Sequence, residues 1–345
     1  MRHSVFIYFL LAFLVVSLMG GSVLTTYTQF VAEGPLETQT ETLITKGKSL
    51  RKIAKQLYRE GIIASPSIFE IGVRASGETN NIKAGEYAIP RRASSKMVMK
   101  ILTSGNTYIR RLVVPEGLTS EQVVALMKDA KGLVGEVIQI PKEGTLLPDT
   151  YHYSYGDTKE GMITRMQKAM DRTLEELWAN RDPKITIKTP KEAIVMASII
   201  EKETSRNSER AHIASVFYNR MKQGIRLQSD PTVIYAVTDG HVDQMKRVTY
   251  KDLKFQSPYN TYVIYGLPRA PISNPGRASL QAVLHPMTTK DVYFVADGTG
   301  GHVFSPTYKE HQQNVQNWRQ ISKGKKSTPK KEVQNEGKVP TSDMG

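Results

Sequence analysis

TPKEAIVMASIIEKETSRNSERAHIASVFYNRMKQGIRLQSDPTVIY, residues 189–235, contains the signals for three helices joined by short turns. Thr189 can cap the first helix, Pro190 suits its first position, and Glu192 completes a capping box three residues after the cap. The segment 193–200 is apolar on nearly every side, which is typical of a helix that is buried on most of its surface. These residues therefore predict a buried helix that begins at Pro190.

The apolar pattern of this helix ends in charged residues while the helical phase continues. A stripe through Met196 and Ile200 reaches Glu203 at the spacing of three to four residues, so Glu203 extends the buried face. Glu201 shares another side of the helix with Ser198, and we expect that side to be wetter. Burial raises the pKa of a carboxyl group, and a carboxylic acid that is protonated near neutral pH can protonate a leaving group. The spacing alone leaves a polar residue at a fraying helix end as the alternative for Glu203.

The rest of the stretch predicts two more helices around this acid. Ser208 can cap the second helix, which has Glu209 in its first turn and ends at Gly224. Asp230 can cap a third, short helix that starts at Pro231.

Several motifs in this region closely resemble those of a known family. The runs ASIIEKET, SER, ASVFYNR and LQSDPTVIY, followed by SPYNTY, GLP and YFVADGTGGHVF, occur in the order found in the YceG-like family, the endolytic murein transglycosylases. The resemblance implies that the chain is an enzyme, a peptidoglycan lytic transglycosylase, and that its catalytic glutamate is the second acid of the EKET run, Glu203. It also implies a single-pass membrane protein that acts on nascent glycan strands and limits their length.

The resemblance further implies chemistry with a single acid. Glu203 would protonate the glycosidic oxygen between N-acetylmuramic acid and N-acetylglucosamine and then act as base on the C6 hydroxyl, which leaves a 1,6-anhydromuramoyl end. Gln228 resembles the glutamine that faces the acid in lysozyme-like transglycosylases, with a spacer between helices as the alternative. The candidate substrate-binding residues are Gln228, Asp230, Asn260 and Tyr262, of which Asn260 and Tyr262 would orient the N-acetyl group.

A second carboxylate is the main open question about the chemistry. Most glycoside hydrolases use two carboxylates, and Asp149, Glu209 and Asp230 are the candidates here. Glu209 and Asp230 already have roles at helix starts. A hydrolytic muramidase and a non-catalytic membrane-anchored glycan-binding protein therefore remain alternatives.

Composition restricts the classes of function. The chain has 345 residues, 39% of them hydrophobic, and no cysteine, which excludes disulfides and thiol nucleophiles. Its histidines show no metal-ligand spacing, so we expect neither a metal nor a cofactor. The formal charge is +14, and the segment 323–345 holds six lysines against three acids. Without a helix-turn-helix or an RNA-binding signature, anionic lipid or an acidic wall polymer fits this charge better than nucleic acid.

The N-terminus contains a candidate membrane span. Residues 5–24 carry no charge and are long enough to cross a bilayer once. Arg2 and His3 precede them and Glu33 is the next charged residue, so the positive-inside rule places the N-terminus in the cytoplasm and the rest outside. A cleaved signal peptide is the competing interpretation. We expect a single-pass protein of the inner (cytoplasmic) membrane with its catalytic domain on the periplasmic side.

We predict an α+β chain with these parts. They are a cytoplasmic N-terminus with a transmembrane helix (1–25), a linker (26–41), a small LysM-like module (42–105), a connecting strand and helix (106–150), a lysozyme-like, mainly helical catalytic domain with a β-hairpin (151–320), and a disordered basic tail (321–345). A LysM-like module implies affinity for glycan, with a scaffolding role as the alternative. The expected partners are peptidoglycan strands, the inner membrane and, from the family alone, membrane-bound wall-synthesis enzymes.

Overall fold

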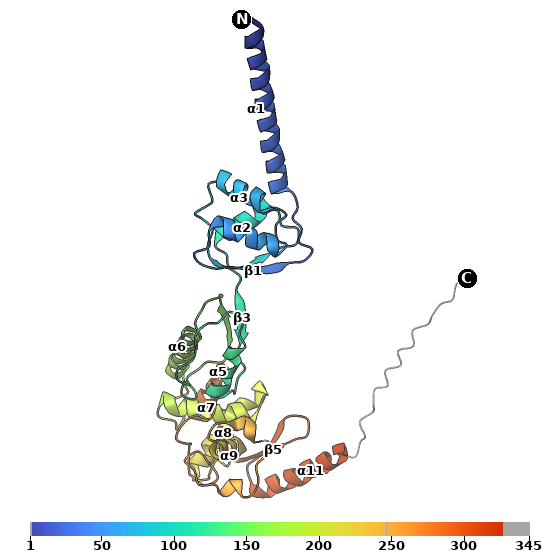
Figure 1. Ribbon diagram of the computed structural model, residues 1–345. Helices are drawn as coiled ribbons and strands as arrows, with labels where there is room; N and C mark the ends of the chain where they lie inside the picture. Colours follow the sequence, from blue (N-terminus) through green and yellow to red (C-terminus); the bar gives the residue numbers. More distant parts are fainter. Residues whose placement is uncertain (1, 246, 327–345) are drawn as a thin grey trace, which may run out of the picture. The chain divides into compact units, whose positions relative to one another are not determined.

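The computed structural model describes residues 2–245 and 247–326 and has the predicted α+β composition (Figure 1). The helices are α1 (Arg2–Val31), α2 (Leu50–Arg59), α3 (Pro66–Ala75), α4 (Ser95–Ser104), α5 (Ser120–Lys128), α6 (Lys159–Ala179), α7 (Pro190–Glu203), α8 (Asn207–Lys222), α9 (Asp230–Thr238), the short 3-10 helices η1 (Val242–Gln244) and η2 (Asp252–Lys254), α10 (Arg277–Leu284) and α11 (Tyr308–Lys326). The strands are β1 (Thr40–Ile44), β2 (Gly85–Ile89), β3 (Arg110–Val113), β4 (Thr150–Tyr153), β5 (Tyr293–Ala296) and β6 (His302–Ser305). Within the described residues they form antiparallel pairs, β1 with β2, β3 with β4 and β5 with β6.

The N-terminal helix is longer than its sequence predicts. Its segment Phe9–Val31 has a mean hydropathy of 2.1, and its most apolar stretch is not buried by protein, so α1 is long and apolar enough to span a membrane. The helix continues to Val31, through the first residues of the segment 26–41 that was predicted as linker. Phe30 and Leu36 are buried in the core that follows, and the ring of Phe30 lies directly against Gly72. Burial of these apolar side chains orders part of that segment.

The chain forms two compact units. The first contains the described residues up to Val113 together with Leu126–Val137 and Thr150–Met162. The second contains Val114–Ala125, Ile138–Asp149 and the described residues from Ile163 onward. The segment 106–150 therefore contributes to both units.

The core of the first unit lies between the β1–β2 ladder and helices α2, α3 and α4. The ladder pairs Thr40 with Ile89 and Ile44 with Gly85. Apolar residues at helical spacing form the inner face of each helix, and the fully buried members of this core include Leu57, Phe69, Tyr87, Val98 and Leu102. Along the chain these elements follow the order strand, two helices, strand, helix.

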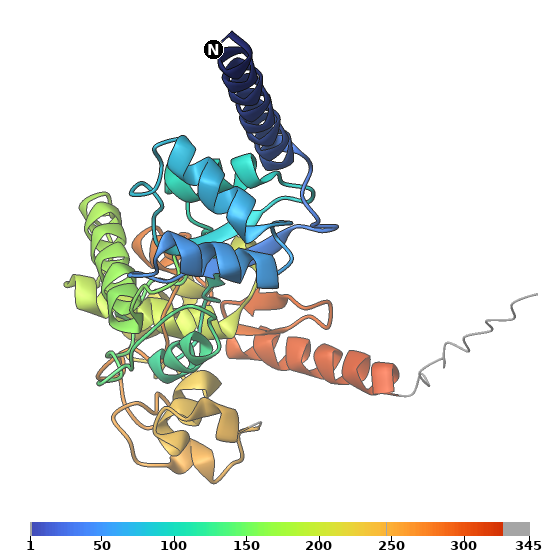
Figure 2. The same cartoon turned by 45° about the horizontal axis from the view of Figure 1, so that its top comes forward.

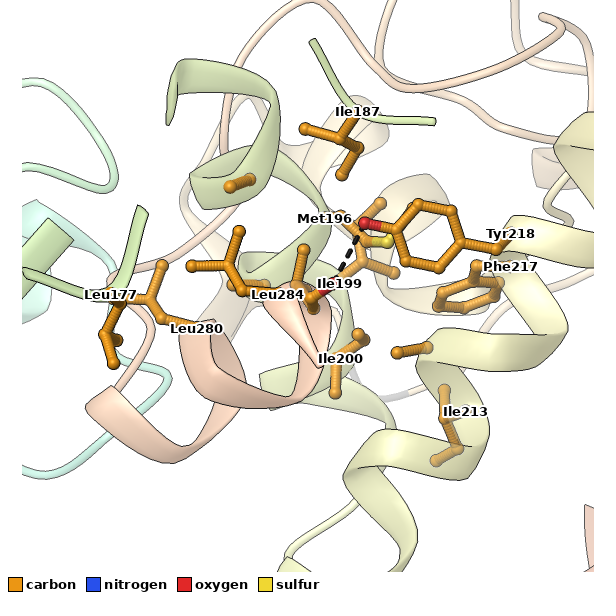
Figure 3. Packing of buried hydrophobic residues seen from close by; sticks show 14 of the residues in the cluster. Leu177, Ile187, Met196, Ile199, Ile200, Ile213, Phe217, Tyr218, Leu280 and Leu284 are labelled. Carbon is orange, nitrogen blue, oxygen red and sulfur yellow. Dashed lines mark hydrogen bonds between the residues drawn. The ribbon is translucent and has the colours of Figure 1, made fainter. Parts of the chain in front are cut away.

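The core of the second unit is built around α7. The capping box of Thr189 and Glu192 is present as predicted, and the helix starts at Pro190. Residues of α7 pack against α8 and α10, and Figure 3 shows Ile199 and Ile200 among side chains of both helices. Tyr218 of α8 donates a hydrogen bond of 2.9 Å from its hydroxyl to the carbonyl of Val283. The rigid surroundings of α7 hold the end of this helix in place.

A hairpin and a last helix complete the second unit. The predicted β-hairpin is present: residues 297–301 join β5 to β6, and α11 lies along this hairpin (Figure 2). The helix extends to Lys326, so residues 321–326, which were predicted to begin a disordered tail, are helical. Residues 327–345 of the predicted tail lie outside the described part of the chain.

Candidate active site

Glu203 is the last residue of α7. The helix ends there because Thr204 is extended, with φ −146° and ψ 140°. The glutamate is half-buried, and the hydroxyl of Ser229 donates a hydrogen bond to its Oε1. Its Oε2 bonds to no protein atom within residues 2–245 and 247–326. One carboxyl oxygen is therefore held by the protein while the other can meet a ligand.

The hydroxyl of Ser229 is positioned by a network of buried groups. The side-chain oxygen of Thr261 accepts a 2.9 Å hydrogen bond from the amide of Ser229. The hydroxyl of Thr232 donates to the Ser229 carbonyl at 2.6 Å and lies 2.8 Å from the hydroxyl of Thr261. All three residues are nearly or completely buried. A donor fixed in this way restrains the orientation of the Glu203 carboxyl group.

The surroundings of Glu203 favour its protonated form. Burial is the largest effect and raises the pKa of Glu203 to about 7, against the hydrogen bond from Ser229, which lowers it. The charge of Asp230 also raises the pKa, whereas His302 and Arg220 lower it. A carboxyl group with this pKa exchanges its proton readily near neutral pH, which suits a group that must act first as acid and then as base.

Helix α8 and the hairpin contribute charged groups that act on the Glu203 carboxyl group. Glu209 accepts hydrogen bonds from the His302 backbone amide at 3.0 Å and pairs with His302 Nδ1 at 2.7 Å. The guanidinium of Arg220 is buried and donates to the carbonyls of Leu227 and Val292, both at 2.6 Å. These contacts join α8, the loop before α9 and the hairpin into one rigid wall.

Asp230 and Tyr262 form a second pair near the acid. The Tyr262 hydroxyl donates to Asp230 Oδ1 at 2.6 Å, and Asp230 is exposed. Burial raises the pKa of Tyr262, and its bond to Asp230 raises it further, so the phenol stays protonated. The structure thus brings Asp230 and Tyr262 together at the edge of the site.

Gln228 and Asn260 have different surroundings. Gln228 is exposed and has φ 51°, a left-handed conformation that residues other than glycine rarely adopt. It directly precedes Ser229. Asn260 is fully buried, and its side-chain amide donates to the carbonyls of Phe255 at 2.8 Å and Leu253 at 3.2 Å. Its Oδ1 accepts the amide of Tyr262 at 2.9 Å, so Asn260 organises the loop that carries Tyr262.

The expectation that Glu201 lies on a wetter side of α7 is wrong. Its side chain is 3% exposed, and Ser198 is completely buried. Arg210 contacts Glu201 Oε1 at 2.7 Å, and the backbone amide of Gly276 donates to Oε2 at 2.9 Å. The loop before α10 and helix α8 cover this side, which the helical period of α7 alone could not reveal. Both oxygens of Glu201 are occupied, and its role is structural.

No group of three or more His, Cys, Asp or Glu side chains within the described residues could hold a metal ion. The other two candidates for a second carboxylate differ from Asp230. The Glu209 carboxylate is paired with His302. Asp149 is exposed and directly precedes β4, and its backbone carbonyl accepts a hydrogen bond of 3.0 Å from the Val114 amide.

Comparison with known proteins gives the relationships of the whole chain. Residues 42–317 match the model of the YceG-like family. The chain belongs to the YceG-like family. A relative from Bacillus subtilis strain 168, named endolytic murein transglycosylase, is 33% identical over 312 residues, which are 80% of this chain and 85% of the relative. A protein of the same name from Streptococcus pneumoniae strain D39 is 27% identical over 79% of this chain, which spans only 57% of that relative.

A solved structure agrees with this relationship. The crystal structure of a YceG-like protein from Listeria monocytogenes is 33% identical in sequence. It aligns over 80% of this chain and 99% of its own, with a TM-score of 0.53.

Three groups around Glu203 in this YceG-like protein escaped sequence reasoning: Ser229, His302 and Arg220. Ser229 precedes α9 and has the residue type and position of a helix cap, but its hydroxyl makes no cap hydrogen bond and points to Glu203 instead. The helix begins at Asp230, one residue earlier than predicted. His302 lies ninety-nine positions after Glu203 and Arg220 lies inside α8, so no local spacing marks either as a neighbour of the acid.

The hydrogen bond from Ser229 leads to a prediction about the pH dependence of kcat/KM. This bond lowers the pKa of Glu203, so Ser229→Ala should raise that pKa above the native value of about 7. If protonated Glu203 is the active form of the free enzyme, kcat/KM of the native protein falls as the pH rises through about 7. We expect the alkaline limb of the Ser229→Ala profile to lie at higher pH. An unshifted limb would remove Ser229 from the control of this proton.

Proposed function

We propose that this protein is an endolytic lytic transglycosylase that cuts the bond between N-acetylmuramic acid and N-acetylglucosamine in peptidoglycan. The observation that carries the proposal is Glu203, a half-buried carboxyl group whose pKa is raised to about 7 and whose Oε2 has no protein partner in the described part of the chain. Membership of the YceG-like family and two relatives named endolytic murein transglycosylase support the same reaction.

Glu203 acts twice in the proposed reaction. It first gives its proton to the glycosidic oxygen as the bond from C1 of the muramoyl residue to that oxygen breaks. The resulting carboxylate then takes the proton of the C6 hydroxyl, whose oxygen bonds to C1 and closes the 1,6-anhydro ring. The acid is regenerated, and no water is consumed. Because the attacking hydroxyl belongs to the same sugar, proximity supplies much of the rate.

The neighbouring groups divide into positioning and binding roles. Ser229 holds Oε1 and leaves Oε2 toward the glycosidic oxygen. Gln228, Asp230 and Tyr262 are the candidate contacts for the sugar, with the phenol of Tyr262 held by Asp230. Asn260 contributes indirectly in this proposal, since its buried amide already serves the loop and supports Tyr262.

The cellular setting is part of the proposal. Helix α1 anchors the chain in the cytoplasmic membrane, with Arg2 and His3 on the cytoplasmic side and both compact units on the periplasmic side. Residues 42–105 act as a LysM-like module and the second unit as a lysozyme-like catalytic domain. An anchored enzyme of this kind meets strands close to where membrane-bound enzymes make them, and internal cuts there limit strand length.

Mass analysis of the sugar ends tests the proposal. The full chain in detergent should release fragments with 1,6-anhydromuramoyl ends from purified peptidoglycan, and Glu203→Gln should release them at least about 10²-fold more slowly. Reducing ends would identify a hydrolase and make Asp230 the candidate for a second carboxylate. Binding without cleavage by the native protein would favour a glycan-binding protein.

A further inference from the structure

The first unit contains a cavity, whereas Glu203 belongs to the second unit. The volume of the cavity is about 460 Å³, which lies within the range of sites that hold small ligands. It is lined by residues of β3 and its approach, by the end of α5 and the turn after it, and by β4, namely Tyr108, Ile109, Arg110, Arg111, Leu112, Val113, Leu126, Asp129, Ala130, Lys131 and Tyr153. All of these belong to the first unit. We call this cavity the β3 pocket.

One wall of the β3 pocket is rigid. The guanidinium of Arg110 is held by Glu86 through bonds of 2.7 and 2.8 Å and by Glu41 at 2.8 Å. It lies 5.1 Å from the centre of the Tyr108 ring, and the Tyr153 hydroxyl donates to the Lys131 carbonyl at 3.0 Å. The charge of Arg110 is therefore compensated by two carboxylates, and its side chain serves to fix the aromatic wall.

Two other cations of the pocket are available to a ligand. Arg111 is exposed, and its side chain makes no ion pair or hydrogen bond with any other described residue. The ammonium of Lys131, whose side chain is 70% exposed, has one long contact of 3.7 Å, to Glu41. Asp129 is the single acid among the lining residues. In the described part of the chain Arg111 has no carboxylate partner and Lys131 has only this long contact, so both can donate to the carboxylates of a ligand.

The strand that lines the pocket favours a peptide over other anions. Across the described residues β3 pairs with β4 alone, so one edge of β3 lacks a strand partner. Every residue from Tyr108 to Val113 lines the pocket, which means that the cavity follows the strand along its length. An extended peptide can add its backbone hydrogen bonds to such an edge. A phosphate group or a lipid headgroup has no peptide backbone and cannot extend the sheet at this edge.

We propose that the β3 pocket binds a carboxylate-bearing extended peptide, which on the peptidoglycan substrate is the acidic stem peptide attached to the muramoyl residue. Arg111 and Lys131 form ion pairs with the carboxylates, the edge of β3 forms hydrogen bonds with the peptide backbone, and Tyr108 contacts the apolar side chains. The identity of this peptide rests on the proposed function. The protein then contacts its polymer at two places, the sugar at Glu203 and a stem at β3.

The test measures binding of the free stem peptide, released from peptidoglycan by an amidase, to the full chain in detergent. Arg111→Glu with Lys131→Glu should raise the Kd by about tenfold or more, because two charge-assisted contacts become repulsive. Lys168→Glu with Lys184→Glu makes the same charge change at exposed sites outside the pocket and should leave the Kd unchanged. The stem peptide with its carboxylates amidated should bind as weakly to the native protein as the acidic peptide does to the pocket variant.

Two results for the peptide would overturn the proposal: an unchanged Kd in the pocket variant, or an equal rise of the Kd in the control variant. Binding to anionic lipid vesicles is measured beside it. A pocket variant that loses vesicle binding but keeps peptide binding would make the pocket a lipid headgroup site. Cleavage of glycan strands that carry no stem peptides measures the Glu203 chemistry independently of peptide binding. A native protein that cleaves these strands but binds no peptide disproves the β3 pocket and leaves the proposed function intact.

Discussion

Glu203→Gln is expected to lower the rate of strand cleavage by about 10²- to 10⁴-fold, the usual contribution of a general acid or base. Glutamine has the shape of the acid and can still accept the Ser229 hydrogen bond, but it has no proton to give and cannot act as base. Steady-state release of new sugar ends measures the rate. Glu175→Gln makes the same charge change on the exposed face of α6 and should retain full activity. Native activity in Glu203→Gln would mean that another residue is the general acid.

The same substitution should stabilise the protein at alkaline pH. Burial raises the pKa of Glu203 from 4.5 to about 7, so the folded state binds more protons than the unfolded state between these values. The native protein therefore loses stability as the pH rises through this window, and above pH 7 the full cost of the buried charge is present. We expect Glu203→Gln to be more stable than the native protein by about 1–3 kcal/mol at pH 8 and by little at pH 4.

Urea unfolding at the two pH values measures this difference. Glu175→Gln should follow the native protein at both. A gain for Glu203→Gln that is equal at pH 4 and pH 8 would mean that the burial of its charge is not the cause.

Arg210→Met should lower the free energy of unfolding by about 3–5 kcal/mol, because it leaves a buried carboxylate without its counter-ion. The side chains of Arg210 and Glu201 are 5% and 3% exposed, and Nη2 of Arg210 contacts Glu201 Oε1 at 2.7 Å and Glu116 at 2.9 Å. Arg277→Met removes one partner of an exposed ion pair with Glu176 and should change stability little, since water screens such pairs. Urea denaturation of both variants provides the comparison.

A double variant separates the ion pair from simple packing. Nε and Nη1 of Arg210 are buried without partners, so the native pair is incompletely compensated. Replacing both ions, as Glu201→Met with Arg210→Met, removes the stranded charge and should recover much of the lost stability. If the double variant is as unstable as the sum of the single variants, the loss comes from packing and the electrostatic explanation fails.

Local patterns predicted most of the helices near the site. The capping box at Thr189 and the apolar run behind it involve residues within a few positions of each other, so a short window contains the whole interaction. The β-hairpin of β5 and β6 was predicted as well, and it also joins residues that are close in sequence. The helical phase also brought Glu203 into consideration, but it placed Glu201 on a wetter side of the helix, whereas the Glu201 side chain is only 3% exposed.

The errors have one physical origin. A helical period describes which residues share a face, whereas burial depends on what covers each face. The amide of Gly276 and the guanidinium of Arg210 cover the Glu201 side of α7. Residues 321–326 and 26–31 were predicted as tail and linker because their composition is polar, but both continue helices, and at the N-terminal end Phe30 packs into a core.

The sequence alone thus determines the helix of Glu203, its start at Pro190, an apolar N-terminal helix and the family motifs, because each depends on neighbours in sequence. The partners of the acid depend on folding. Ser229, His302 and Arg220 come from a loop, a hairpin and another helix, and only the packing of these elements withdraws the Glu203 carboxyl group from water and raises its pKa. An acid at a helix end is a matter of sequence, and its proton affinity is a property of the folded protein.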